Sequence, residues 1–214
     1  MLMKKSRRPW LSAAIILFAG TVSTASALGR FTLGVKGGLN SANLRVKSDV
    51  TVSTFQSYNA FVWGGFIAYR LSGLFSVQLE VLNNPKGSKL QQAISGSNYD
   101  TTLMYKYTEI PLLIKLAQGQ MGKLAPSLYA GPYWAKLREA KIRAKSGRDD
   151  FTEDLTGQKS TDVGLVFGLG LDYDLGPVLL VGDFRYGLGL VDVDKGEGGS
   201  LNHRVFSFTA GFAF

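Results

Sequence analysis

The single histidine of this 214-residue chain is the first place to look for chemistry, because histidine is the most frequent general acid or base in enzymes. Ser207 follows His203 four residues later, and these two residue types together could serve nucleophilic catalysis. At the usual rise of an extended strand, however, residues four apart lie about 13 Å from each other. No hydrogen bond could join them directly, so we expect no catalytic role for this pair and expect a histidine at the rim of the fold.

Other reactive chemistries are scarce in this chain. It has no cysteine, which excludes disulfide scaffolds, iron–sulfur clusters, thiolate zinc sites and cysteine nucleophiles. The segment 192–198 combines carboxylates with glycines, as calcium loops do, but it lacks the EF-hand spacing. We therefore expect a flexible acidic loop there, and no metal or cofactor in the protein.

A net charge of +8 would suit a nucleic-acid-binding protein, but half of that charge lies in an N-terminal segment that we expect to be cleaved. Four basic residues precede the apolar run from Leu11 to Gly20, and Ala25-Ser26-Ala27 supplies a small-residue cleavage motif. This is the three-part pattern of a secretory signal peptide. It predicts cleavage after Ala27, with 1–27 as the signal peptide and 28–214 as one mature domain. The mature charge falls to +4, no basic stripe remains, and we expect no nucleic-acid partner.

From Arg30 onward, apolar residues alternate with polar or small ones at a period of two, which is typical of β-strands. These strands must position the remaining polar residues. In 163–173, for example, six large apolar or aromatic residues alternate with glycines and polar residues. Most such runs approach the ~9–11 residues of a tilted membrane strand. Eight strands are predicted, over about 30–41, 59–71, 74–83, 102–117, 124–137, 163–173, 180–190 and 203–214.

The connections between these strands alternate in length. Short turns are expected near 72–73, 119–123 and 175–177, and long polar loops over 42–58, 84–101, 138–160 and 191–202. Membrane barrels of bacteria have short periplasmic turns and long outer loops. The pattern predicts an all-β fold, an eight-stranded antiparallel up-and-down transmembrane β-barrel in the outer membrane, with both termini in the periplasm. A soluble β-sandwich would have no reason to segregate its loops, and a lipocalin-like carrier would be apolar inside.

Projecting the alternation inward places four positive and four negative side chains in the lumen. They are Lys36, Arg70, Glu80, Glu109, Lys115, Asp172, Asp183 and Arg185. Isolated buried charges are costly, so we expect a balanced, cross-bonded network that fixes strand register and plugs the lumen. Eight strands leave room only for side chains or one small ligand. The alternative is therefore a narrow polar conduit or a small-ligand site.

Two further features point to partners. The chain ends on an aromatic strand that resembles the signal read by the outer-membrane barrel assembly machinery, with one face formed by Phe206, Phe208, Phe212 and Phe214. The third outer loop carries a basic patch, Lys141, Arg143, Lys145 and Arg148, followed by carboxylates. We expect a solvated hairpin with offset charges. The alternative is that this basic arm contacts lipopolysaccharide phosphates beside the outer-membrane lipids.

Three segments resemble the PorT-like outer-membrane β-barrel family, which is common in Bacteroidetes. They are the opening strand 34–44, the "Glu-Ile-Pro-Leu" strand 107–115 and the "Ala-Gly-Pro" segment 129–133. The resemblance implies an eight-stranded outer-membrane barrel of this type, but no single biochemical activity. We expect a structural, adhesive or envelope-complex interaction role without enzyme activity, and an envelope protein as a partner. The alternatives are a narrow porin-like channel for small solutes, or a lipid A-modifying enzyme, as some eight-stranded barrels are.

Overall fold

The computed structural model describes residues 30–47, 55–94, 97–117, 121–146, 149–155, 157–191 and 200–214. These residues form nine strands: β1 (Phe31–Lys47), β2 (Phe55–Arg70), β3 (Phe75–Ile94), β4 (Ser97–Ala117), β5 (Leu124–Ser146), β6 (Asp149–Asp154), β7 (Thr161–Asp174), β8 (Leu179–Gly189) and β9 (Ser200–Ala213). The predicted signal peptide, 1–27, lies outside the described residues.

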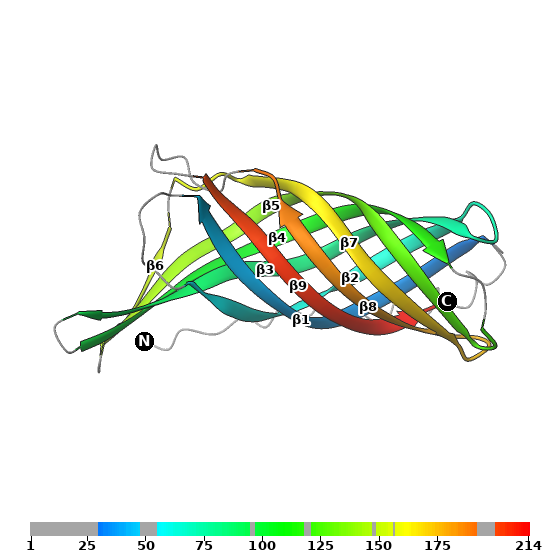
Figure 1. Cartoon of the computed structure of the whole chain (residues 1–214), viewed down its shortest axis with the longest axis horizontal. Coiled ribbons are helices and arrows are strands. Elements are labelled where there is room, and N and C mark those ends of the chain that lie inside the picture. The colour runs from blue at the N-terminus through cyan, green and yellow to red at the C-terminus, as the bar shows by residue number, and fades with distance from the viewer. Residues whose placement is uncertain are drawn as a thin grey trace, which may run out of the picture.

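Eight of these described strands close into an antiparallel barrel (Figure 1). Each strand pairs with its neighbour in the chain, except that β5 passes over β6 to pair with β7, and β9 closes the ring on β1. The closure also uses the chain end, because the backbone N–H of Phe214 donates to the carbonyl of Leu33 at 2.8 Å. The predicted eight-stranded antiparallel barrel is confirmed.

The two faces of the barrel wall differ in polarity. Along β9, His203, Ser207 and Thr209 are buried, whereas Phe206 and Phe208 are 51% and 61% exposed. The outer face carries exposed aromatic and aliphatic side chains on the other strands as well. An apolar outside around a polar inside is the arrangement of a lipid-embedded barrel and the inverse of a lipocalin-like carrier.

Glycines on the inner face of β7 make room for tyrosines on β5. Gly168 is opposite Tyr129 and Gly164 is opposite Tyr133 in the register. A Cβ added at either glycine would overlap the facing ring. In this narrow lumen, the rings of Tyr129 and Tyr133 therefore fit because the facing residues on the neighbouring strand are glycines without a side chain.

The described strands have short turns at one end, with 71–74, 121–123 and 175–178 among the described residues, and this is the end where the C-terminus is found (Figure 1). Gly176, with φ 95°, and Gly122, with φ 67°, adopt the left-handed conformation that tight turns use. By the convention of bacterial barrels this end is periplasmic. No helix long and apolar enough to cross a membrane occurs among the described residues.

At the opposite end, strands replace much of two predicted outer loops. β3 and β4 pair as far as Ile94 and Ser97, within the predicted loop 84–101. β5 continues to Ser146 and pairs with β6, within the predicted loop 138–160. Figure 1 shows these hairpins projecting beyond the barrel. The loop predictions were wrong there because strands that leave the membrane lose their apolar outward face, and with it the hydrophobic alternation, while the backbone ladder continues.

Candidate functional site: the barrel lumen

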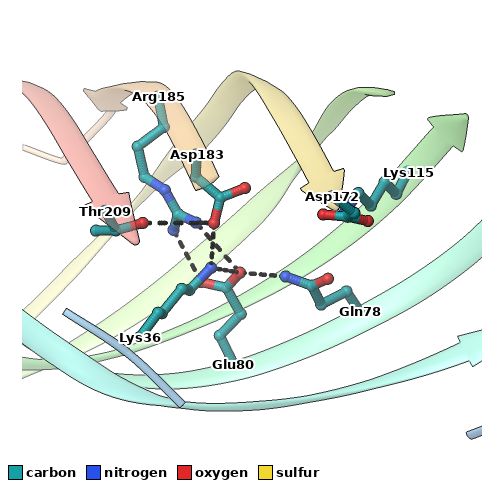
Figure 2. A network of polar contacts seen from close by, with 8 residues as sticks. All are labelled: Lys36, Gln78, Glu80, Lys115, Asp172, Asp183, Arg185 and Thr209. Atoms are coloured by element: carbon teal, nitrogen blue, oxygen red, sulfur yellow. Dashed lines mark hydrogen bonds and ion pairs between the residues drawn. The ribbon is translucent and has the colours of Figure 1, made fainter. Parts of the chain in front are cut away.

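Four charged side chains meet inside the barrel and form what we call the central charge cluster, Lys36, Glu80, Asp183 and Arg185. Lys36 Nζ on β1 lies 2.6 Å from Glu80 Oε1 on β3 and 2.9 Å from Asp183 Oδ2 on β8. Arg185 Nη1 lies 2.8 Å from Glu80 Oε2, and its Nη2 lies 3.3 Å from Asp183 Oδ2. Figure 2 shows these ion pairs crossing the lumen. Two cations and two carboxylates thus compensate each other in a site where none is more than 6% exposed.

Neutral groups complete the central charge cluster. Gln78 Nε2 donates to Glu80 Oε1 at 2.6 Å, and the Thr209 hydroxyl donates to Asp183 Oδ2 at 3.4 Å (Figure 2). The Lys36 ammonium lies 5.3 Å from the centroid of the Phe66 ring, at cation–π distance. Because buried charges need hydrogen bonds as well as opposite charges, these contacts allow four ionised groups to remain inside the barrel.

A second group of charged side chains lies in the same lumen, and we call Lys86, Glu109 and Asp162 the upper charge cluster. Of these three residues, only Glu109 was predicted from the sequence. Lys86 Nζ is 2.8 Å from Glu109 Oε2 and 3.0 Å from Asp162 Oδ2, which also accepts a 3.0 Å hydrogen bond from the Tyr133 hydroxyl. Lys86 was not predicted because it falls in the predicted loop 84–101, and Asp162 was not predicted because it lies just before the predicted strand 163–173. The alternation of strand faces could have identified both residues, because alternate residues point to the same side. Lys86 lies an even number of residues from the inward-facing Glu80, and Asp162 an even number from Asp172.

His203 lies inside the barrel and not at its rim, which corrects the prediction. Its side chain is 1% exposed and stands edge-on to the rings of Tyr105 and Tyr107, with centroids 5.6 and 5.7 Å away. Neither ring nitrogen has a hydrogen-bond partner within the described part of the chain. The rim prediction failed because β9 begins at Ser200, so His203 is several residues inside the strand rather than at its start.

The remaining predicted lumen residues lie toward the periplasmic end. Lys115 Nζ on β4 and Asp172 Oδ2 on β7 form an ion pair at 2.9 Å, separate from the central charge cluster (Figure 2). Arg70, at the end of β2, is exposed and has no ion-pair partner among the described residues. Of the eight predicted lumen charges, four form the central charge cluster and Glu109 belongs to the upper charge cluster. Lys115 and Asp172 pair with each other, and Arg70 lies at the periplasmic end of the lumen without an ion-pair partner among the described residues.

The predicted basic patch lies on the projecting hairpin of β5 and β6, where carboxylates face much of it. Lys141 Nζ lies 2.6 Å from Glu139 Oε1, and Arg143 Nε donates to Asp150 Oδ1 at 2.7 Å. The hydrogen bond from Arg143 holds the pKa of Asp150 below its ordinary value. Lys145 is exposed, and Arg148 lies outside the described residues.

The structure also places the aromatic C-terminal residues. Phe206, Phe208 and Phe212 are half exposed or more on the outer face of β9, and Phe214 continues the pairing with β1. The rings of Phe206 and Tyr186 lie 4.8 Å apart, so the aromatic face extends onto β8. Within the described ranges, no group of three or more His, Asp or Glu side chains could hold a metal ion.

Solved structures of similar proteins are outer-membrane barrels of low sequence identity. OprG from Pseudomonas aeruginosa is 15% identical with a TM-score of 0.46, over 86% of this chain and 95% of that chain. Neisserial surface protein A is 17% identical with a TM-score of 0.45, over 86% and 95%. Outer membrane protein W of Escherichia coli is 17% identical with a TM-score of 0.43, over 86% and 97%. A search of curated proteins returned no match.

The comparison with family models identifies the family of this chain, which the structural likenesses do not. Residues 18–195, which include most of the described strands, match the outer membrane protein beta-barrel domain family. The lipid-facing apolar wall and the polar lumen described above fit a protein of the outer membrane. The chain belongs to the outer membrane protein beta-barrel domain family.

Proposed function

We propose that this protein is a closed outer-membrane barrel whose role is structural, adhesive or interaction-based within the cell envelope. The observation that carries the proposal is the central charge cluster. Arg185 and Lys36, from β8 and β1, both reach Glu80 on β3, so ion pairs span the lumen. A wide conduction path for ions would have to break them, and breaking a buried pair leaves an uncompensated charge.

The projecting hairpins supply the surface for the proposed interactions. β5 leaves β7 at the pair Lys136 and Thr161 and continues outward against β4 and β6. The hairpin that β5 forms with β6 carries exposed charged side chains and, on β6, Phe151, which is 59% exposed. We propose an envelope protein as its partner, with lipopolysaccharide phosphates as a second contact for exposed basic residues such as Lys145. Outer-membrane lipids would cover the apolar wall, and the assembly machinery would read the C-terminal phenylalanines.

A narrow channel for small solutes is the second candidate function. The observation in its favour is a set of buried polar atoms that have no hydrogen-bond partner in the described part of the chain, among them Ser127 Oγ, Tyr129 Oη and Arg185 Nε. Buried groups of this kind are usually satisfied by water. Water in the lumen would leave a thin hydrated path beside the ion pairs.

The absence of enzyme activity is likewise our proposal. His203 and Ser207 are both buried, and the His203 nitrogens form no hydrogen bond with a nucleophile or carboxylate among the described residues. Membership of the PorT-like branch is also proposed, on the motifs in 34–44, 107–115 and 129–133.

Single-channel recording in planar bilayers tests the closed barrel. We expect the purified protein to insert without conductance of the size of open porins, and such conductance would overturn the closed-lumen proposal in favour of the channel.

The interaction role is tested separately in intact cells. A photo-crosslinking residue at Lys145 on the outer hairpin is compared with one at Lys123 in a periplasmic turn, both exposed positions. We expect an envelope protein, identified by mass spectrometry, to be captured from Lys145 and not from Lys123. Capture of lipopolysaccharide alone would limit the role to lipid contact, and equal capture from both positions would contradict the hairpin assignment.

A further inference from the structure

The periplasmic end of the lumen contains a cavity of about 390 Å³, which we call the vestibule. Its wall includes Arg70 on β2 and Gln78 on β3, together with the ion pair of Lys115 on β4 and Asp172 on β7. This volume is within the range of pockets that hold small ligands. It lies at the end closed by the short turns, away from the projecting hairpins, and so has no part in the proposed interaction role.

One side of the vestibule is apolar. Phe66 on β2 and Val181 on β8 form a small buried cluster with Ala213, and Leu179 packs against it. Phe66, Val181 and Leu179 also line the cavity. A ligand that enters the vestibule therefore meets a hydrophobic surface large enough for an aromatic ring or a short alkyl chain.

The vestibule wall also carries positive charge, and Arg70 lies on β2, the strand of Phe66. Asp172 balances Lys115 at 2.9 Å, which leaves Arg70 as a lining cation without an ion-pair partner among the described residues. Arg70 is exposed and no described carboxylate pairs with it. A guanidinium binds carboxylates and phosphates through two parallel hydrogen bonds, so this residue favours an anionic group.

Lys115, which lines the vestibule, and Asp183 of the central charge cluster both lie close to Gly170. A Cβ on Gly170 would lie 2.6 Å from Ser127 Oγ and 3.4 Å from both Asp183 Oδ1 and Lys115 Cε, so these three side chains surround the space above this glycine. Ser127 is 6% exposed, and its hydroxyl has no partner among the described residues. Ser127 does not itself line the vestibule, but a buried hydroxyl near the lining residue Lys115 is available for a hydrogen bond to a polar atom that reaches it.

From these features we infer that the vestibule is a binding site for a small amphipathic carboxylate. The apolar part of the ligand lies against Phe66, Val181 and Leu179, and its carboxylate pairs with Arg70. The site opens to the periplasm, so it takes ligands from that compartment.

The test uses the full-length mature protein in lipid nanodiscs, with 4-fluorobenzoate as the probe and ¹⁹F NMR line broadening as the readout. Empty nanodiscs give the partition background, and unlabelled benzoate tests competition. 4-Fluorobenzylamine has the same ring and the opposite charge. We expect saturable, competed binding of the benzoate and none of the amine.

Two charge-matched variants decide the role of Arg70. Arg70→Gln should weaken binding of 4-fluorobenzoate about tenfold, as expected for losing a charge-assisted hydrogen bond. Lys123→Gln removes a cation at the same end of the barrel but outside the vestibule lining, and should bind like the wild type. Ala68→Phe, which fills the cavity from the β2 side, should abolish binding, with heat-modifiable gel migration checking that the barrel is folded.

Three outcomes would overturn the inference. They are a benzoate signal no different from that of empty nanodiscs, equal binding of the amine, and equal loss in Arg70→Gln and Lys123→Gln. None of them bears on the proposed role of the outer hairpins, which the crosslinking experiment tests independently.

Discussion

Arg185 and Glu80, which are 105 residues apart in the chain, form a two-point ion pair across the barrel lumen. Nη1 lies 2.8 Å from Oε2 and Nη2 lies 3.3 Å from Oε1. The parallel contacts of a guanidinium with a carboxylate are directional as well as strong. This pair therefore holds β8 and β3, on different sides of the barrel, at a set position relative to each other.

Replacing Glu80 with Gln should destabilise the barrel strongly. Lys36 and Arg185 would then share only Asp183, and removing one partner of a buried ion pair typically costs about 3–5 kcal/mol. Urea unfolding in detergent, followed by tryptophan fluorescence, measures the loss. Glu139→Gln is the matched control on the exposed hairpin and should change the free energy of unfolding little. Similar effects of the two substitutions would contradict a structural role for the cluster.

Removing both cations of the central charge cluster should open the lumen to cations. In the double variant Lys36→Ala with Arg185→Ala, two long side chains are truncated while Glu80 and Asp183 keep their charges. We expect a small, cation-selective conductance in planar bilayers that the wild type lacks. The double variant Lys141→Ala with Arg143→Ala removes the same residue types from the outer hairpin and should remain closed. Anion selectivity in the lumen variant would show that the current takes another route.

Replacing His203 with Phe should leave stability unchanged or raise it. The imidazole is buried against Tyr105 and Tyr107, and neither nitrogen has a hydrogen-bond partner among the residues that the structure describes; a buried polar group without a hydrogen bond costs about 1–3 kcal/mol. Phenylalanine keeps the aromatic contacts without that cost. Unfolding free energy and lipid A cleavage by purified protein are measured together. Lipid A cleavage by the wild type that disappears in His203→Phe would establish the enzyme alternative.

The β6 strand should lose protection in acid. Because the hydrogen bond from Arg143 lowers the pKa of Asp150 below its ordinary value of 3.8, the pair stabilises the hairpin fully above that value. This stabilisation disappears as the pH falls through the lowered pKa. Hydrogen-exchange protection of β6 amides, corrected for intrinsic rates, should fall below pH 4. In Asp150→Asn the pH dependence should vanish, and an unchanged profile there would rule out this pair as the cause.

Shortening the aromatic face at the chain end should impair assembly in cells more than folding in vitro. Phe214→Ala alters the C-terminal residue, and Phe184→Ala removes an exposed ring from the outer face of β8. We expect the folded, heat-modifiable fraction in outer membranes to drop severalfold only for Phe214→Ala, with equal refolding of both variants into detergent. Normal assembly of Phe214→Ala would argue against the C-terminal signal.

The strand segments inside the membrane could be predicted because their signal is local. In 163–173 and 203–214, the polarity of a residue indicates whether its side chain faces the lipid or the lumen. The observed strands β7 and β9 contain nearly all of these positions. The strands within the hairpins could not be predicted in the same way. In 84–88 the inward residues Asn84, Lys86 and Ser88 are buried, but Pro85 and Gly87 between them are not large apolar residues, so the alternation of polarity that marks a membrane strand is absent.

The sequence by itself determined the class of fold, the inward face of each membrane strand and the near balance of charge within the lumen, because period-two polarity and turn residues are properties of short segments. Only the tertiary structure decided the partners. Barrel closure brings Lys36, Glu80 and Arg185 to one level, and the extension of β3 and β7 brings Lys86 to Asp162 and buries His203 nearby. Those meetings depend on the register between strands far apart in the chain, and register arises from the pairing of whole strands rather than from any one of them.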